Sequence, residues 1–254
     1  MPVEIQQRPR CNLILHCGAS AVPRMEVARV TTPKPTETWT PIPHISLLES
    51  VESSLRAVSL RIGNQSHALS ADGDQYFGLI ELLGSEQRDY NLVVGIRNSH
   101  NKTLPIGLVA GTSVFVCDNL SFNGSVRLMR RHTTNAQKDL PFLVSRGVGK
   151  LMQLWNQNDQ RVAAYKECRI KDKTMHDLAI RAVDVEACTN RMLPLILKEW
   201  REPRYECFAE KNCWAAYNSF TEVLKGNLQE LPRRTEALTG LFDTAVGLPA
   251  PHLN

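Results

Sequence analysis

Basic side chains gather in one stretch of the chain, between Asn119 and Lys150. This stretch holds six lysine and arginine residues against one acidic residue, whereas the whole chain of 254 residues carries a formal net charge of only +4. Such an excess can hold a polyanion, most commonly a phosphate backbone, although a solvated basic face without a ligand gives the same pattern. Hydroxyl and amide side chains in RRHTTNAQK can add phosphate contacts that read no bases. The residues that we expect to contact nucleic acid are Arg127, Arg130, Arg131, His132 and Lys138.

A second set of polar side chains lies in and near the segment RNSHNK, which separates two apolar runs. His100 in this segment could act as a general base, a metal ligand or a phosphate contact, or it could hydrogen-bond its own turn. Asp118 and Asn119 follow the apolar run VFVC, where a strand end often places a catalytic carboxylate, although both residue types also form ordinary turns. The residues of this candidate functional loop are Arg97, Asn98, Ser99, His100, Asp118 and Asn119.

The histidines and cysteines do not show the spacing of a metal site. No histidine of the N-terminal half has another at i+2 or i+4, so no single element presents two ligands; these histidines are His44, His67, His100 and His132. The seven cysteines contain no CxxC pair, which zinc sites usually need. The patterns GxxxxGK[ST], GxGxxG and GxSxG are absent as well. We therefore expect no metal, no cofactor and no enzymatic activity.

The composition is that of a soluble globular protein. Hydrophobic residues make up 43% of the chain and charged residues 22%, which argues against wholesale disorder. The sequence has no apolar run long enough to span a membrane, and its N-terminus lacks the continuous apolar segment of a secretion signal. We expect a cytoplasmic protein with reduced thiols and no membrane contact.

The N-terminal half combines a helical pattern with several β-type runs. In HISLLESVESSLRAV, apolar residues at spacings of three and four share one face of a helix; they are Ile45, Leu48, Val51 and Leu55. The β-type runs are residues 58–62, 67–70, 76–83, 92–97, 106–109, 113–117 and 125–131. The turn-prone pairs are Gly63-Asn64, Asp72-Gly73 and Asn123-Gly124. We predict an antiparallel meander with one face covered by the helix.

The C-terminal half is helical in pattern. Asp139 is predicted as an N-cap with Pro141 in the first turn, and one long helix, kinked near Gly147, is predicted to reach Tyr165. Further helices are predicted at residues 174–187, 191–200, 209–224 and 233–246. The fold class is therefore α+β, an antiparallel sheet with a packed helix followed by a helical C-terminal half. The chain divides into a proline-rich arm or lead-in (1–38), a sheet domain (39–134) and a helical region packed on it (135–254).

Four segments resemble a known family. WTPIPHISLLESVE, YNLVVGIRNSHNKTLPIGLVAG, VFVCDNLSFNG and RRHT, in this order, resemble the phage- and plasmid-borne proteins known as domain of unknown function 932, which tend to show an IPHxxLLE helix and an NSHDGT-like loop. The resemblance covers residues 39–134 well, and the C-terminal CWAAYNSFTEVLKG and LPRRTEAL are similar to the helical tail of one branch. Asn101 stands where the family's loop often has Asp, so a role of that Asp would not carry over.

The resemblance implies a mobile-element context and no established enzyme activity. The order of helix, meander, basic edge and helices also looks like phage single-strand annealing proteins of the Red-beta type, which act on DNA as oligomers. Our leading hypothesis is a phage- or plasmid-associated protein that binds nucleic acid, DNA above all, in single-strand annealing or recombination, as a homo-oligomer. One alternative is an interaction protein that inhibits or titrates a host defence factor; another is a metal-dependent nuclease that uses His100 and Asp118.

Overall fold

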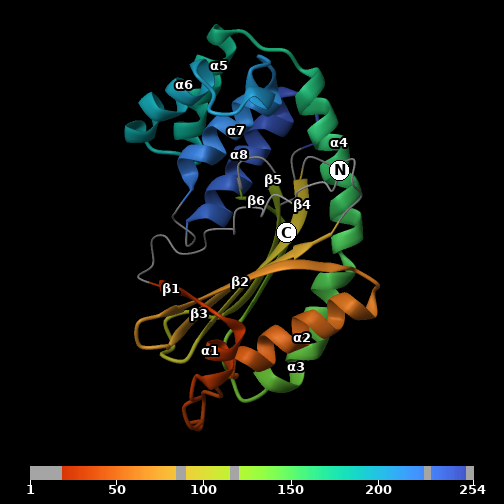
Figure 1. Cartoon of the computed structure of the whole chain (residues 1–254), viewed down its shortest axis with the longest axis vertical. Helices are drawn as coiled ribbons and strands as arrows, with labels where there is room; N and C mark the ends of the chain where they lie inside the picture. The colour runs from red at the N-terminus through yellow and green to blue at the C-terminus, as the bar shows by residue number, and fades with distance from the viewer. Residues whose placement is uncertain (1–18, 84–89, 115–119, 226–229, 250–254) are drawn as a thin grey trace, which may run out of the picture.

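A six-stranded antiparallel sheet with its strands in sequence order forms the centre of the molecule (Figure 1). The computed structural model describes residues 19–83, 90–114, 120–225 and 230–249. The strands are β1 (Ala19–Val22), β2 (Ile62–Ser70), β3 (Gln75–Leu82), β4 (Tyr90–Ser99), β5 (Ile106–Val114) and β6 (Leu120–Arg130). The helices are α1 (Arg24–Arg29), α2 (His44–Ala57), α3 (Ala136–Gly149), α4 (Leu151–Glu167), α5 (Asp172–Asp184), α6 (Leu193–Arg201), α7 (Cys213–Leu224) and α8 (Leu231–Ala245), with short 3-10 turns η1 (Asn190–Met192) and η2 (Glu206–Phe208). The predicted α+β class is confirmed.

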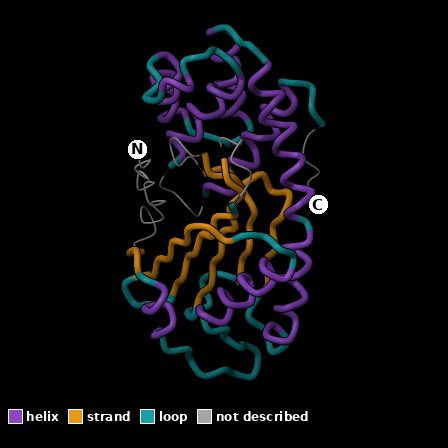
Figure 2. Tube along the Cα trace, turned by 45° about the vertical axis from the view of Figure 1, so that its right-hand side comes forward, coloured by secondary structure: helices purple, strands orange, loops and turns teal. Residues whose placement is uncertain are grey.

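Helices cover the two faces of the sheet at different ends. Figures 1 and 2 show α2 and α3 against its lower part, the lobe of α5–α8 above it, and α4 running along one side between them. The apolar face of α2 predicted from its periodicity is buried, and it packs in one core with Leu92 and Val94 of β4. Val93, the residue between them, points the other way and belongs to the core of α7 and α8. Because β4 is buried on both faces, it forms a nearly continuous apolar run.

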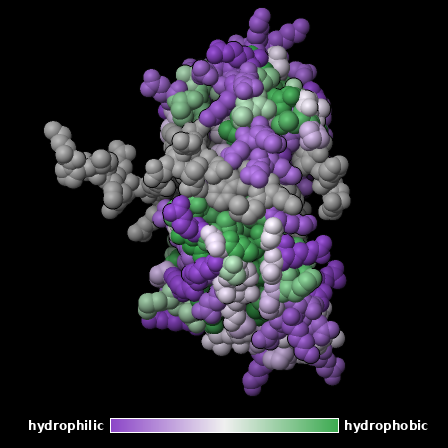
Figure 3. Space-filling model, turned by 90° about the vertical axis from the view of Figure 1, so that its right-hand side faces the viewer, coloured by the Kyte–Doolittle hydropathy of each residue, from purple (hydrophilic) through white to green (hydrophobic). Residues whose placement is uncertain are grey.

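Polar side chains dominate both ends of the surface drawn in Figure 3, and apolar side chains gather near its middle, beside the atoms drawn in grey. No helix in the described ranges is long and apolar enough to cross a membrane.

Two of the three predicted turns are wrong. Gly63 and Asn64 lie inside β2, at a register irregularity between Ile62 and Gln65, and Asn123-Gly124 lies inside β6, at a second irregularity. A glycine next to a polar residue can therefore mark a bulge in a continuing strand as well as a hairpin. The third pair is a true turn, because Gly73 has a φ of +74° and its N–H donates to the Ser70 carbonyl at 2.8 Å.

The predicted long helix is two helices, α3 and α4, which meet at Lys150. α3 also begins earlier than predicted, because backbone hydrogen bonds to Thr133 and Asn135 start the helix at Ala136. Pro141 consequently lies inside the helix, and Asp139 is a first-turn residue and no N-cap.

Part of the predicted lead-in joins the sheet. β1 pairs with β2 as an edge strand, from Ala19 opposite Ser70 to Val22 opposite His67. α1 follows and places Val27 in the core with α2. The prolines between α1 and α2 lead the chain along the strand ends to His44. These ends carry the candidate site.

Candidate functional site

Three histidines from distant parts of the chain come together at the ends of the strands. His44 begins α2, His100 follows β4, and His132 follows β6. The rings of His44 and His100 stack with centroids 3.8 Å apart and an interplanar angle of 6°. Trp39 lies beside His132, with ring centroids 6.4 Å apart. We call His44, Asn98, His100 and His132, with Trp39, the histidine cluster; its three histidines are 94% or more buried, at 1%, 4% and 6% exposed.

Hydrogen bonds assign the protonation of two of these rings. The Asn98 side-chain amide donates to the Ile42 carbonyl at 2.8 Å and to His44 Nδ1 at 2.9 Å. Because His44 Nδ1 accepts, the ring carries its proton on Nε2, which donates to the Gly73 carbonyl at 3.1 Å. His100 Nε2 donates to the same Ile42 carbonyl at 3.0 Å. These side chains thereby hold the segment before α2 against the strand ends.

Burial keeps His44 and His132 uncharged. Desolvation, assisted by the neighbouring His100 and His132, lowers the pKa of His44 to about 4, although the bond to Gly73 opposes this shift. Desolvation also lowers the pKa of His132; the Thr40 backbone opposes this in part, although neither His132 ring nitrogen reaches hydrogen-bonding geometry. At neutral pH the rings of His44 and His132 are therefore uncharged.

Several buried polar atoms of the cluster have no hydrogen-bond partner within the described part of the chain. They are Trp39 Nε1, Asn98 Oδ1, His100 Nδ1 and both ring nitrogens of His132. Unpaired buried groups of this kind are uncommon in folded proteins. They do not amount to a metal site, since the ranges that the structure describes contain no group of three or more His, Cys, Asp and Glu side chains able to hold an ion. The cluster can therefore donate and accept further hydrogen bonds.

Positively charged side chains lie beside the cluster. We call Lys102, Arg130, Arg131 and Lys138 the basic rim. Lys102 Nζ lies over the Trp39 ring, 5.0 Å from its centroid. Arg130 Nη2 donates to Asp139 Oδ2 at 2.5 Å, which neutralises part of its charge. Arg131 and Lys138 are exposed, and neither forms an ion pair with a described residue. The rim therefore offers two exposed cations without an ion pair, a lysine that lies over an aromatic ring, and one half-compensated arginine.

The structure separates the predicted site residues. Asn98, His100 and His132 meet in the cluster, and the burial of His132 places it below the surface. The ion pair of Arg130 with Asp139 links the segment of Arg130 and Arg131 to the segment of Lys138. Ser99 serves its own turn, because its hydroxyl donates to the Leu104 carbonyl and accepts from the Leu104 N–H.

The other predicted residues lie away from the cluster or outside the description. Arg97 lies across Gly107 on the neighbouring strand, with Nη2 3.5 Å from the sulfur of Met129. Arg127 is placed in β6 opposite Val109, but its side chain is outside the described part. Asp118 and Asn119 lie outside the described residues altogether. Trp39 and His44 were not predicted to join His100, although both lie in WTPIPH, the first segment of the family resemblance.

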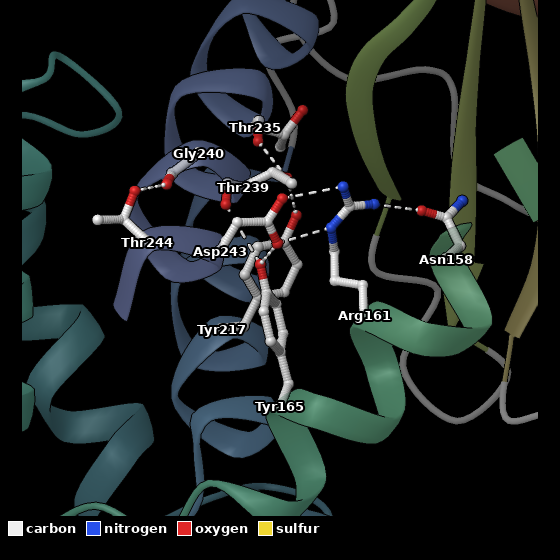
Figure 4. Close-up of polar contacts among 9 residues, drawn as sticks. All are labelled: Asn158, Arg161, Tyr165, Tyr217, Thr235, Thr239, Gly240, Asp243 and Thr244. Carbon is white, nitrogen blue, oxygen red and sulfur yellow. Dashed lines mark hydrogen bonds and ion pairs between the residues drawn. The ribbon is translucent and has the colours of Figure 1, made fainter. Parts of the chain in front are cut away.

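A second polar centre, which the sequence did not indicate, lies between α4 and α8 (Figure 4). Arg161 binds both carboxylate oxygens of Asp243, Nε to Oδ1 at 2.8 Å and Nη2 to Oδ2 at 2.9 Å. Arg161 Nη1 also donates to Asn158 Oδ1 at 2.6 Å, and the Tyr165 hydroxyl donates to Asp243 Oδ1 at 2.8 Å. We call Asn158, Arg161, Tyr165, Thr239 and Asp243 the Arg161 network. The adjoining cavity of about 20 Å³ has room for roughly one water, so the network serves to join α4 to α8.

Comparison with known proteins adds one match. A family model described as "Domain of unknown function (DUF932)" matches residues 35–239. No curated protein and no solved structure matches the chain. The matched range contains the whole histidine cluster and the whole basic rim.

Proposed function

The chain belongs to the DUF932 family, whose description gives no activity, and from its own residues we propose that it binds nucleic acid through the basic rim. The observation that carries the proposal is the pair of exposed, unpaired cations, Arg131 and Lys138, that flank the Arg130–Asp139 ion pair. A lysine or arginine without a protein carboxylate can neutralise a phosphate and release its counterions, which drives sequence-independent binding.

The histidine cluster would serve as the rigid base of this surface. Its hydrogen bonds to Ile42 and Gly73 fix the segment that carries Trp39, and the Thr40 N–H donates to the His132 carbonyl at 3.1 Å. Because burial keeps His44 and His132 neutral, we expect the charge that a phosphate meets to come from the rim. Of the residues proposed from the sequence, Arg131 and Lys138 would contact phosphate directly, Arg130 would contribute less, and His132 would support them from below. Arg127 is the remaining proposed contact.

Trp39 favours single-stranded nucleic acid. Its half-buried ring lies at the rim, and bases exposed in a single strand can stack on an aromatic side chain without sequence preference. Lys102 now covers the ring, and a phosphate that attracts the ammonium group would uncover it. We accordingly propose a single-strand annealing or recombination role, in the phage or plasmid setting that the family resemblance implies, with DNA as the first partner to test.

Fluorescence anisotropy of a labelled single strand and of its duplex tests the proposal. We expect salt-sensitive binding that prefers the single strand. The double variant Arg131→Glu plus Lys138→Glu should bind about tenfold more weakly at low salt, with a salt dependence shallower by about two phosphate contacts. Lys171→Glu plus Lys173→Glu, on exposed residues around the start of α5, makes the same charge change away from the rim and should bind normally.

Equal losses in the two double variants would reduce the effect to net charge and refute the rim as the site. No binding at low salt would exclude nucleic acid altogether and would leave a protein partner as the better hypothesis.

A further inference from the structure

Two cysteines far apart in the sequence lie directly opposite each other at the junction of α4, α5 and α7. Cys168 ends α4, and Cys213 is the first residue of α7. A short antiparallel bridge pairs Arg169 with Asn212. On one side of this bridge, the Cys213 N–H donates to the Cys168 carbonyl at 2.8 Å. On the other side, the Ile170 N–H donates to the Lys211 carbonyl at 3.0 Å. This register makes Cys168 and Cys213 cross-strand partners.

The register brings the two thiols within bonding range. Cross-strand partners that share a backbone hydrogen bond have Cα atoms about 5.5 Å apart, with side chains on the same face. Disulfides span Cα distances of about 4.4–6.8 Å. The Cys168 side chain is also close enough to contribute to the raised pKa of Cys213. Both cysteines are free thiols in this structure.

We propose that Cys168 and Cys213 are a disulfide-forming pair that locks the segment of α5 and α6 between the end of α4 and the start of α7. Noncovalent contacts already hold this segment. Trp200 Nε1 of α6 donates to Asp172 Oδ1 of α5 at 2.8 Å, and Lys211 Nζ lies 4.4 Å from the centroid of the Trp200 ring. A disulfide would close the segment covalently at the point where its two ends meet.

Exchange with a small disulfide such as glutathione disulfide supplies the oxidation. Cys168 is partly exposed, so its thiolate attacks the glutathione disulfide; the protein–glutathione disulfide forms, and one glutathione leaves and takes up the Cys168 proton. Cys213 then transfers its proton to the second glutathione as its sulfur bonds to the Cys168 sulfur. Two protein thiols and one glutathione disulfide yield one protein disulfide and two glutathione thiols. Burial, with the Cys168 side chain alongside, raises the pKa of Cys213 to about 12, so Cys213 is the resolving thiol.

The other described cysteines provide the comparison. Cys207 is exposed and Cys188 is buried, and neither is a cross-strand partner of another cysteine in the described ranges. The pair lies in the helical lobe of α5–α7, away from the basic rim at the strand ends (Figure 1). Disulfide formation can therefore be tested independently of nucleic-acid binding.

Intact-mass measurement and peptide mapping of the full-length protein after incubation with glutathione disulfide test the proposal. Oxidised protein should lose two hydrogens and give one cross-linked peptide that joins Cys168 to Cys213. Cys168→Ser and Cys213→Ser should each abolish this species, and Cys207→Ser, the matched exposed control, should retain it. Oxidised wild type should also melt at a higher temperature than reduced wild type, because the cross-link constrains the unfolded chain.

Three results would overturn the proposal. They are alkylation of both cysteines after oxidation, a stable glutathione adduct at Cys168 without cross-linking, and a cross-link that joins Cys213 to a different cysteine. All three are read from the wild-type protein, so they do not depend on the folding of a serine variant.

Discussion

The histidine cluster and the Arg161 network are both buried and polar, but they use opposite chemistry. The network neutralises a buried carboxylate with an arginine that binds both of its oxygens. In the cluster, His44 and His132 are neutral, and atoms of Asn98, His100 and His132 have no hydrogen-bond partner among the residues that the structure describes. A buried ion pair with good geometry holds two elements together and has little capacity left for a ligand. Unsatisfied polar groups beneath a charged rim instead retain the capacity to bind a ligand.

The strongest way to break this contrast is to remove the carboxylate of the network. Asp243→Ala leaves the Arg161 guanidinium buried without its partner, so we expect a loss of about 3–5 kcal/mol in the free energy of unfolding. Urea denaturation measures it. Asp184→Asn, at the exposed end of α5, should change stability by less than about 0.5 kcal/mol. The folded fraction of Asp243→Ala should bind DNA normally; weakened binding would make the network part of the site.

The matching change in the cluster is Asn98→Ala. It removes both donors that serve Ile42 and His44, so we expect a loss of about 2–3 kcal/mol in the free energy of unfolding. In contrast to Asp243→Ala, the folded fraction should also bind DNA more weakly, because the segment that carries Trp39 is released. Denaturation and anisotropy on the same sample separate the two effects. A variant that is destabilised but binds normally would reduce the cluster to a structural role.

Acid should weaken the cluster. The pKa of His44 is lowered from 6.5 to about 4 in the folded protein, so the unfolded chain binds the additional proton first. The contribution of neutral His44 is complete above pH 6.5 and is lost as the pH falls from 6.5 towards 4, by about 3 kcal/mol. Unfolding midpoints measured across this range should decrease, and they should decrease less in His44→Gln. His176→Gln, at an exposed histidine, should keep the full decrease. Identical pH dependence in both variants would contradict this assignment.

The smallest expected effect belongs to Lys102. An exposed cation–π contact contributes about 0.5–1 kcal/mol, so Lys102→Gln should leave the unfolding midpoint almost unchanged. In this variant, the salt dependence of DNA binding should become shallower by about one phosphate contact. Anisotropy titrations at several salt concentrations measure this slope. An unchanged slope would show that Lys102 only covers Trp39.

Local patterns in the sequence predict the fold better than they predict the site. The spacing of Leu48, Val51 and Leu55 places α2 on the sheet, because helical periodicity is a local property. Both polar centres depend on long-range placement. His44 and Asn98 of the cluster are separated by 54 positions, and Arg161 and Asp243 of the network by 82. No residue spacing signals such a pair. The same limit hid the placement of Cys168 opposite Cys213.

The burial of β4 on both faces has a further consequence for how the molecule responds to heat. Leu92 and Val94 belong to the core beneath α2, and Val93 belongs to the core of the helical lobe. Neither core can unfold without exposing one face of β4, the strand that the two cores share. The protein should therefore unfold in one cooperative transition. A ligand bound at the strand ends would then raise the melting temperature of the distant helices as much as that of the sheet.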